Sequence, residues 1–227
     1  MVEFVCATRK SKEEFWKSTP LGISLMRISG GAKATGSIFY ENEKGLSEVY
    51  NICLNNPYSS EILVFIHDDV WLDDLWVVEK IKDALSVYDI VGVAGNERLV
   101  EGDYGWAFLN DRFELDEEEH LSGRVAHRDN TISVISYYGK SPKECALLDG
   151  VFIAVNKIKC NEKKVVFDPQ FKFHFYDLDF CRTAKEKSLK LGTWPISLTH
   201  QSGGEFNSEA WRKALCLYRL KWGVSLK

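Results

Sequence analysis

Strand-like and helix-like patterns alternate along the first 95 residues, and this alternation constrains the fold more than any other feature of the sequence. The predicted order is strand, helix, strand, helix, strand, helix and strand, over residues 2–8, 11–18, 22–29, 45–56, 61–66, 73–88 and 89–95. Such an order with short connections is typical of βαβ units, whose strands are parallel. We therefore expect an α/β fold with a Rossmann-like, mostly parallel central sheet flanked by helices.

The segment "EILVFIHDDVWL" (61–72) combines a strong strand pattern with a polar end. Its continuous apolar run is typical of a parallel strand that is covered on both faces. In sheets of this kind, ligands bind beyond the carboxyl ends of the strands. The polar residues predicted at such ends are Thr8, Arg9, Ser29, His67, Asp68 and Asp69. This edge of the sheet is therefore the predicted location of a binding site.

The second half of the chain is less regular. Its patterns predict strands at 131–139, 145–157 and 193–204, an extended run that becomes a helix over 171–192 and ends at Gly192, and a helix at 208–223. No linker rich in Pro, Gly or Ser separates the two halves. We therefore expect a single domain over residues 1–227.

The composition limits the partners and the compartment. The chain has 227 residues, of which 45% are hydrophobic, and its net charge of −4 argues against nucleic acid as a partner. Six cysteines without a Cys-x-x-Cys pair are typical of reduced, buried thiols. No signal peptide and no run of about 20 apolar residues is found. We expect a cytoplasmic protein without an integral membrane segment, docked peripherally on a membrane if its acceptor is lipid-linked.

The residues His67, Asp68 and Asp69 have the chemistry of a divalent-cation site, because carboxylate oxygens are hard ligands and an imidazole shifts the preference from magnesium toward manganese. In an extended segment, residues 67 and 69 point the same way and residue 68 points the opposite way. The alternative is that these acids only form a turn or a helix cap. His200 ends another apolar run and is followed by glycines, so it is predicted on the same edge, although a single histidine is commonly structural.

Two further segments carry candidate residues. Asp177 and Asp179 lie where an aromatic run becomes a helix, so either could be an N-cap, or a general base that the helix amides keep ionised. The pair Asp149-Gly150 interrupts an apolar strand, which indicates a bulge, a close approach of a ligand, or a simple kink. The usual P-loop, dinucleotide-binding, nucleophile-elbow and H-E-x-x-H motifs are missing.

Taken in chain order, "NEKGLSEVYNICL", "FIHDDVWL", "LLDGVFIAV", "FHFYDLDFCRTAKEKSLKLG", "LTHQSGG" and "KWG" resemble glycosyltransferase-like proteins of GT-A fold, which are related to the inverting family 2 glycosyltransferases. The resemblance extends from about residue 2 to residue 223 and is vaguest between 97 and 143. It implies a GT-A fold, a nucleotide-sugar donor such as a UDP-sugar, a Mn²⁺ or Mg²⁺ ion, and a glycan or other hydroxyl acceptor.

The resemblance also implies roles for single residues. The triplet 67–69 takes the place of the Asp-x-Asp motif, so that Asp69 holds the metal, His67 resembles a His-x-Asp subgroup, and His200 completes the metal site. The segment "YDLD" matches a Glu-Asp-x-Asp segment, which makes Asp177 the general base and places Tyr176 where the family has Glu. The residues that the resemblance assigns to the donor are Thr8, Arg9, Ser29, Asn42, Asn51, Asp68, Asp149, Gly150 and Asp179.

Three functions are compatible with this sequence. The first is an active, metal-dependent, inverting glycosyltransferase. The second is a GT-A domain that binds a nucleotide or sugar without transfer, which His67 and Tyr176 favour as departures from the family pattern. The third is a nucleotidyltransferase, although "TRKSKEEF" after the first strand supplies basic residues without the expected glycines.

Overall fold

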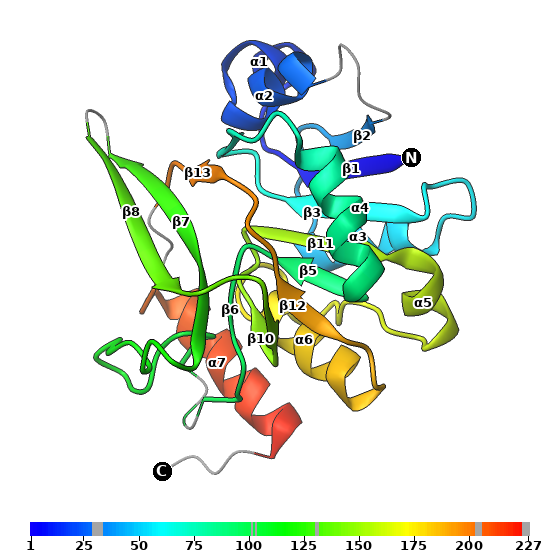
Figure 1. The fold of residues 1–227 in the computed structure, drawn as a ribbon. Coiled ribbons are helices and arrows are strands. Elements are labelled where there is room, and N and C mark those ends of the chain that lie inside the picture. Colours follow the sequence, from blue (N-terminus) through cyan, green and yellow to red (C-terminus); the bar gives the residue numbers. More distant parts are fainter. Residues whose placement is uncertain (29–33, 101, 103, 130–131, 203–205, 224–227) are drawn as a thin grey trace.

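Two mixed β-sheets form the centre of the fold, and helices pack around them (Figure 1). The computed structural model describes residues 1–227 except 29–33, 101, 103, 130–131, 203–205 and 224–227. The helices are α1 (Lys12–Ser18), α2 (Pro20–Ile28), α3 (Leu46–Asn55), α4 (Val77–Val87), α5 (Lys157–Glu162), α6 (Tyr176–Glu186) and α7 (Glu209–Trp222).

The first sheet has seven strands, in the order β2 (Ala34–Phe39), β1 (Val2–Ala7), β3 (Ile62–Ile66), β11 (Phe152–Asn156), β5 (Ile90–Gly92), β12 (Leu191–Thr193) and β9 (Lys143–Cys145). The second sheet has the order β10 (Leu147–Leu148), β6 (Ala94–Asn96), β7 (Leu121–Asp129), β13 (Leu198–His200) and β4 (Val70–Leu72), and β8 (Ile132–Gly139) pairs with β7.

The prediction of a mostly parallel sheet is wrong. In the first sheet, β1 is parallel to β2 and to β3, and β5 is parallel to β12. In contrast, β11 is antiparallel to both β3 and β5, and β12 is antiparallel to β9. The antiparallel strand β11 follows directly from β10 of the second sheet, so it does not enter the first sheet through a helical crossover. The α/β class is therefore confirmed, and the sheets are mixed.

Short connections carry the chain from one sheet to the other. Residues 67–69 join β3 to β4, and residues 149–151 join β10 to β11. The predicted strands at 89–95 and 193–204 are each divided in the same way, into β5 and β6 and into β12 and β13. These connections place polar residues at the junction of the two sheets.

The prediction of a strand at 22–29 is also wrong, because the described part of this segment belongs to helix α2. Pro20 opens the helix, a position that suits its fixed φ angle and its missing N–H. Leu21, Leu25 and Ile28 are buried with the spacing of a helical face. Gly22 allows the close contact with α1, since an added Cβ would lie 2.2 Å from the carbonyl oxygen of Phe15.

Helix α1 is confirmed, and its start has the expected cap. The Ser11 hydroxyl accepts a hydrogen bond from the Glu14 amide, and the Glu14 carboxylate accepts one from the Ser11 amide. Helix α6 ends at Glu186 rather than at Gly192, which lies in β12. Ser188 breaks the helix with a left-handed backbone (φ 61°), and Gly192 leaves room for the Tyr88 ring.

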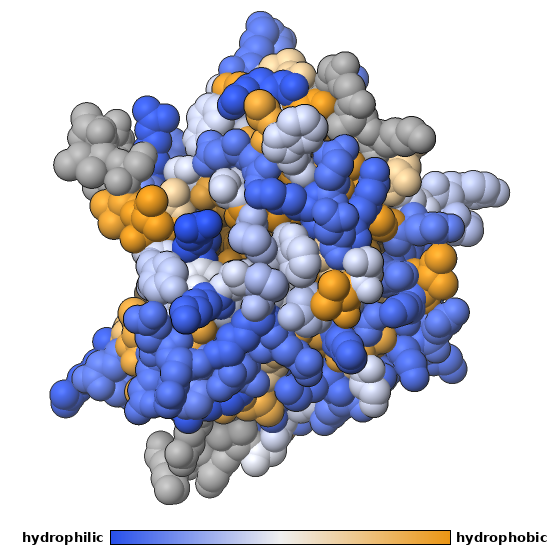
Figure 2. Space-filling view, viewed as in Figure 1, coloured by the Kyte–Doolittle hydropathy of each residue, from blue (hydrophilic) through white to orange (hydrophobic). Residues whose placement is uncertain are grey.

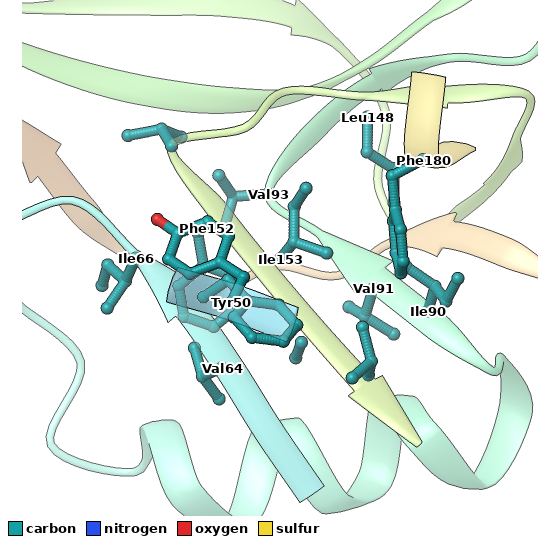
Figure 3. Packing of buried hydrophobic residues seen from close by; sticks show 14 of the residues in the cluster. Tyr50, Val64, Ile66, Ile90, Val91, Val93, Leu148, Phe152, Ile153 and Phe180 are labelled. Atoms are coloured by element: carbon teal, nitrogen blue, oxygen red, sulfur yellow. The ribbon is translucent and has the colours of Figure 1, made fainter. Parts of the chain in front are cut away.

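Aromatic side chains link the helices to the first sheet. Tyr50 of α3 packs on Phe65 of β3 with ring centroids 4.7 Å apart. Phe167 stacks on Phe180 of α6 at 4.0 Å. Figure 3 shows Tyr50, Phe152 and Phe180 among the buried residues around β3, β11 and β5. One continuous apolar cluster therefore includes residues of both sheets, while the assignment of one domain to 1–227 stays a prediction.

The surface in Figure 2 is mainly hydrophilic, with an apolar patch at the outer end of the β7–β8 hairpin. Strand β8 exposes Val134, Ile135 and Tyr137. The six cysteines are free, and all except Cys216 are buried. In the part of the chain that is described, no helix has the length and apolar character to cross a membrane.

Candidate metal and transfer site

The candidate residues meet where the two sheets join. His67, Asp68 and Asp69 lie in the connection between β3 and β4, and His200 is the last residue of β13. Strand β13 pairs with β4 so that His200 is in register with Val70, and the Gln201 amide donates a hydrogen bond to the Asp69 carbonyl. This pairing brings His200 beside the 67–69 connection, from a position far along the chain.

His67, Asp69 and His200 form a group with the geometry of a metal site. One ligand atom from each side chain lies within 4.8 Å of the others. His200 Nε2 is 3.3 Å from Asp69 Oδ1, and the His67 and His200 rings are 6.0 Å apart. His67 and Asp69 belong to one group and Asp68 bonds to Thr8 instead, as predicted, but residues 68 and 69 form a turn and are not extended, so strand parity is not the cause.

The donor set fits a divalent cation. Asp69 Oδ1 is buried and has no hydrogen-bond partner of good geometry among the described residues. Burial alone would raise the pKa of Asp69, but the neighbouring His200 imidazole outweighs it and lowers the pKa to about 2. The carboxylate is therefore ionised at neutral pH. Two imidazoles and one carboxylate suit Mn²⁺ better than Mg²⁺, and three protein ligands leave positions for a substrate.

A cavity of about 640 Å³ adjoins this group. This volume is in the range of small-molecule sites. His67 and His200 line it, whereas Asp69 is not among its lining residues. The predicted site residues that line it are His67, Asp149, Gly150, Asp177 and His200. The aromatic side chains that line it are Tyr104, Trp106, Phe108, Tyr138, Phe173, Phe175, Tyr176, Phe206 and Trp211.

Asp177 lies in the first turn of α6, at the wall of this cavity. Phe175 precedes the helix with a left-handed backbone (φ 63°), which turns the chain into α6. Asp177 Oδ2 accepts a hydrogen bond from the Gly150 amide at 2.9 Å. Burial and the nearby Asp149 carboxylate raise the pKa of Asp177 to about 7, against the opposing backbone hydrogen bonds. The amides at the start of α6 lower the pKa of Asp177 as expected, but burial outweighs them, so the carboxylate is only partly ionised at neutral pH.

The Asp149-Gly150 pair lies in the connection between β10 and β11, and both residues contact other segments of the chain. Asp149 Oδ2 accepts a hydrogen bond from the Trp106 indole at 2.9 Å, and Oδ1 accepts one from the Val151 amide at 2.8 Å. Gly150 is approached closely by Tyr176 and Asp177, since an added Cβ would lie 2.5 Å from the Tyr176 hydroxyl. The glycine is thus required by neighbouring side chains.

Thr8 and Asp68 join the ends of β1 and β3. Thr8 Oγ1 donates a hydrogen bond to Asp68 Oδ2 at 2.5 Å. The backbone amide of Asn42 donates to the Thr8 carbonyl at 2.9 Å, while the Asn42 side chain bonds to the backbone of Lys44. Arg9 follows in an exposed bend. Ser29 lies outside the described residues.

Thr8, Arg9, Asn42 and Asp68 are not among the residues that line the cavity. Neither are Asn51 and Asp179, two further predicted donor-binding residues. The side-chain amide of Asn51 bonds to both the carbonyl and the amide of Phe167, at 2.7 and 3.0 Å. Asp179 is fully buried and accepts hydrogen bonds from Lys221 at 2.9 Å and from the Trp222 indole at 3.0 Å. In the structure, both side chains connect elements of the fold.

Two residues of the site were not predicted from the sequence. Trp106, which holds Asp149, lies in the region 97–143, where the resemblance is vaguest. His127 lies in β7 in register with His200, lines the cavity, and has a buried Nδ1 without a hydrogen-bond partner among the described residues. The alternation of residues 121–129 is the signal that could have placed His127 in a strand.

Comparisons with known proteins show the fold alone. No family model and no curated protein matches the sequence. Among solved structures, A197 from STIV is 10% identical with a TM-score of 0.50, over 92% of this chain and 97% of that one. GalNAc-T7, solved with UDP, GalNAc and Mn²⁺, is 10% identical with a TM-score of 0.55, over 97% of this chain and 47% of that one. The chain thus spans about half of GalNAc-T7, and this likeness supports a GT-A-like fold.

Proposed function

We propose that the chain is a metal-dependent glycosyltransferase, which moves a sugar from a nucleoside-diphosphate sugar to a hydroxyl acceptor with inversion. The observation that carries the proposal is the placement of two chemical groups on one cavity. The group His67, Asp69 and His200 has the geometry of a cation site, and Asp177 lies on the wall of the same cavity. The likeness to GalNAc-T7, solved with UDP, GalNAc and Mn²⁺, supports this kind of donor and metal.

A divalent cation held by His67, Asp69 and His200 would act as a Lewis acid on the diphosphate of the donor. The carboxylate of Asp177 takes the proton of the acceptor hydroxyl, and a pKa of about 7 suits this role at neutral pH. The acceptor oxygen bonds to the anomeric carbon as the bond from that carbon to the diphosphate oxygen breaks. The electron pair of the broken bond leaves with the nucleoside diphosphate. Because attack and departure occur on opposite faces, the anomeric centre inverts.

Other residues are assigned to the substrates. Thr8, Arg9, Asn42 and Asp68 lie around the ends of β1 and β3 and are candidates for the nucleoside end of the donor. Asp149 and Gly150 line the cavity beside Asp177 and are candidates for the sugar. The aromatic remainder of the cavity wall suits a glycan or another hydroxyl compound with an apolar face.

A thermal-shift panel tests the proposal. UDP, GDP, dTDP and CMP are each added with and without Mn²⁺ to the wild type, Asp69→Ala and His200→Ala. A ligand at 100 times its Kd adds about 2.7 kcal/mol, which is a shift of about 5 to 10 °C for a chain of this size. The control is His120→Ala, because His120 belongs to a second group of possible ligands with Glu117 and Glu119. We expect a Mn²⁺-dependent shift with one nucleotide in the wild type and in the control alone.

The nucleotide that binds is then supplied as its sugar conjugate, and transfer or hydrolysis is followed by mass spectrometry. Binding without turnover would favour the non-catalytic alternative. Release of pyrophosphate from a nucleoside triphosphate would favour the nucleotidyltransferase. The absence of a shift with any nucleotide would contradict the glycosyltransferase assignment.

A further inference from the structure

His67 and Tyr176, the two positions at which the sequence departs from the resembled family, contact one another. His67 Nε2 lies 2.9 Å from the Tyr176 hydroxyl oxygen, although the residues are 109 positions apart. His67 belongs to the connection between β3 and β4, and Tyr176 is the first residue of α6. The contact therefore joins the candidate metal group to the helix that carries Asp177.

The hydrogen bonds of the Tyr176 hydroxyl determine the direction of this contact. The hydroxyl lies 2.8 Å from the Gly150 carbonyl oxygen, to which it donates. A carbonyl oxygen only accepts, and a tyrosine hydroxyl has a single hydrogen. Once this hydrogen is directed to Gly150, the oxygen can only accept from His67. Nε2 of His67 then carries a proton, and the lone pair of a neutral imidazole lies on Nδ1.

We infer that Tyr176 is a positioning residue, which holds His67 as the Nε2–H tautomer and leaves Nδ1 to bind a divalent cation together with Asp69 and His200. This inference rests on the metal site of the proposed function. A partner on the second nitrogen of a ligating histidine fixes the tautomer and the orientation of its ring, and loss of such a partner costs 10- to 100-fold in metal affinity.

The surroundings hold both side chains in place. Tyr176 is 3% exposed and packs against Tyr50 and Phe167, with ring centroids 5.8 and 6.0 Å away. The His67 ring is stacked with Phe173 at 6.1 Å and 21°. The hydroxyl contact thus fixes one edge of the imidazole while Phe173 covers a face. The two departures from the family pattern, His67 in place of the first Asp and Tyr176 in place of Glu, therefore depend on each other through this contact.

The test uses the metal-free protein and then Mn²⁺ alone. Proteins labelled with ¹⁵N-histidine are compared by long-range ¹H–¹⁵N spectra, in which protonated and unprotonated ring nitrogens have well-separated shifts; His67→Gln assigns the signal. Tyr176→Phe removes the hydroxyl and keeps the ring. The comparison variant is Tyr50→Phe, since the Tyr50 hydroxyl is buried beside that of Tyr176 in the same aromatic cluster but makes no hydrogen bond of good geometry among the described residues. Thermal melts of the variants verify that each is folded.

We expect the wild type and Tyr50→Phe to have only the Nε2–H tautomer at His67, and Tyr176→Phe to contain the Nδ1–H form as well. The Kd for Mn²⁺, measured from the free-ion EPR signal, should rise about tenfold or more in Tyr176→Phe and remain unchanged in Tyr50→Phe. An Nδ1–H tautomer at His67 in a wild type that binds Mn²⁺ would overturn this inference but not the proposed function. Equal or tighter Mn²⁺ binding by Tyr176→Phe would have the same consequence. A wild type that binds no Mn²⁺ would overturn the metal site and the proposed function with it.

Discussion

The carboxylate of Asp177 accepts a hydrogen bond from the Gly150 amide at 2.9 Å, in a position where burial and Asp149 raise its pKa to about 7. A general base works only when it is deprotonated, so the transfer rate should rise with pH through about 7 and level off above it. Asp177→Asn should lower the rate about 10²-fold or more. Initial rates between pH 5.5 and 9 check both statements. A flat profile, or an active Asp177→Asn variant, would exclude Asp177 as the base.

The same raised pKa predicts how stability depends on pH. The folded pKa lies about three units above the ordinary value of about 3.9, so the folded state binds more protons between about pH 4 and 7. The free energy of unfolding therefore falls as the pH rises through this window. The decrease in the free energy of unfolding is complete above about pH 7 and amounts to at most about 4 kcal/mol. It is smaller if water in the cavity solvates the carboxylate.

Asp177→Asn lacks this ionisation and should be more stable than the wild type at pH 8, with a difference that shrinks toward pH 4. Urea denaturation in the presence of a chelator measures it. Asp83→Asn, a change at an exposed carboxylate of α4, is the control. A difference that does not depend on pH would contradict the raised pKa.

Replacement of Asp179, two residues further along α6, should lower the stability of the fold, whereas Asp177→Asn should raise it. Its carboxylate is fully buried and bonded to Lys221 and Trp222 of α7. Asp179→Ala leaves both donors without this acceptor, and breaking a buried ion pair costs about 3 to 5 kcal/mol. Because Asp168 also contacts Lys221 and still neutralises it in this variant, we expect the loss of stability to lie near the lower end of this range. Nucleotide binding should survive wherever the variant is folded. Normal stability combined with lost nucleotide binding would restore Asp179 to the donor site.

The choice of metal follows from the two imidazoles. Because a histidine nitrogen binds Mn²⁺ better than Mg²⁺, activity removed by a chelator should return at about tenfold or more lower Mn²⁺ than Mg²⁺. Asp69→Asn keeps the shape of the side chain but removes the charge, and should lose this rescue, whereas His120→Ala should retain it. Titrations of activity against each metal measure the effect. Equal rescue by the two ions would argue that only carboxylates hold the metal.

The Thr8–Asp68 hydrogen bond offers a test of the nucleoside end. Thr8→Val keeps the shape of the side chain and removes the donor to Asp68 Oδ2. A hydrogen bond to a charged group contributes about 1.5 to 3 kcal/mol, so the variant should be less stable by about that amount and should bind the nucleotide more weakly. Thr8→Ser keeps the hydroxyl and should restore both. If Thr8→Val loses stability but binds the nucleotide normally, the pair serves the fold alone.

The features that local sequence pattern predicts are those that depend on neighbouring residues. The cap of α1 is set by Ser11 and Glu14, three positions apart. The proximity of His67 and Asp69 follows from their separation by only one residue. The location of His200 at a strand end follows from the apolar run before it. Each could therefore be read from a short segment, and the structure brings the last three residues together.

The features that the sequence does not reveal depend on distant partners. Asn51 is bonded to Phe167, 116 positions away, and nothing near Asn51 indicates that its amide is already satisfied. The antiparallel direction of β11 depends on its entry from the second sheet. The strand predicted at 22–29 is a different case, because Pro20 and the spacing of Leu21, Leu25 and Ile28 are themselves local signals that favour the helix α2.

Gly150 provides a prediction that separates packing from chemistry. A Cβ at this position would lie 2.5 Å from the Tyr176 hydroxyl and 2.9 Å from Asp177 Oδ2, distances at which one of the groups has to move. Gly150→Ala should therefore displace the general base and the residue that contacts His67 together, with a cost of about 1 to 3 kcal/mol in stability. We expect transfer to fall strongly while the nucleoside end, near Thr8 and Asp68, still binds UDP or the nucleotide identified. Adding Tyr176→Phe to this variant removes the closest clash but leaves contacts of 2.9 Å with Asp177 Oδ2 and with the ring of residue 176, so the double variant should regain only part of the stability and should not regain full activity. If Gly150→Ala is as active and stable as the wild type, the close approach of α6 to this connection is wrong.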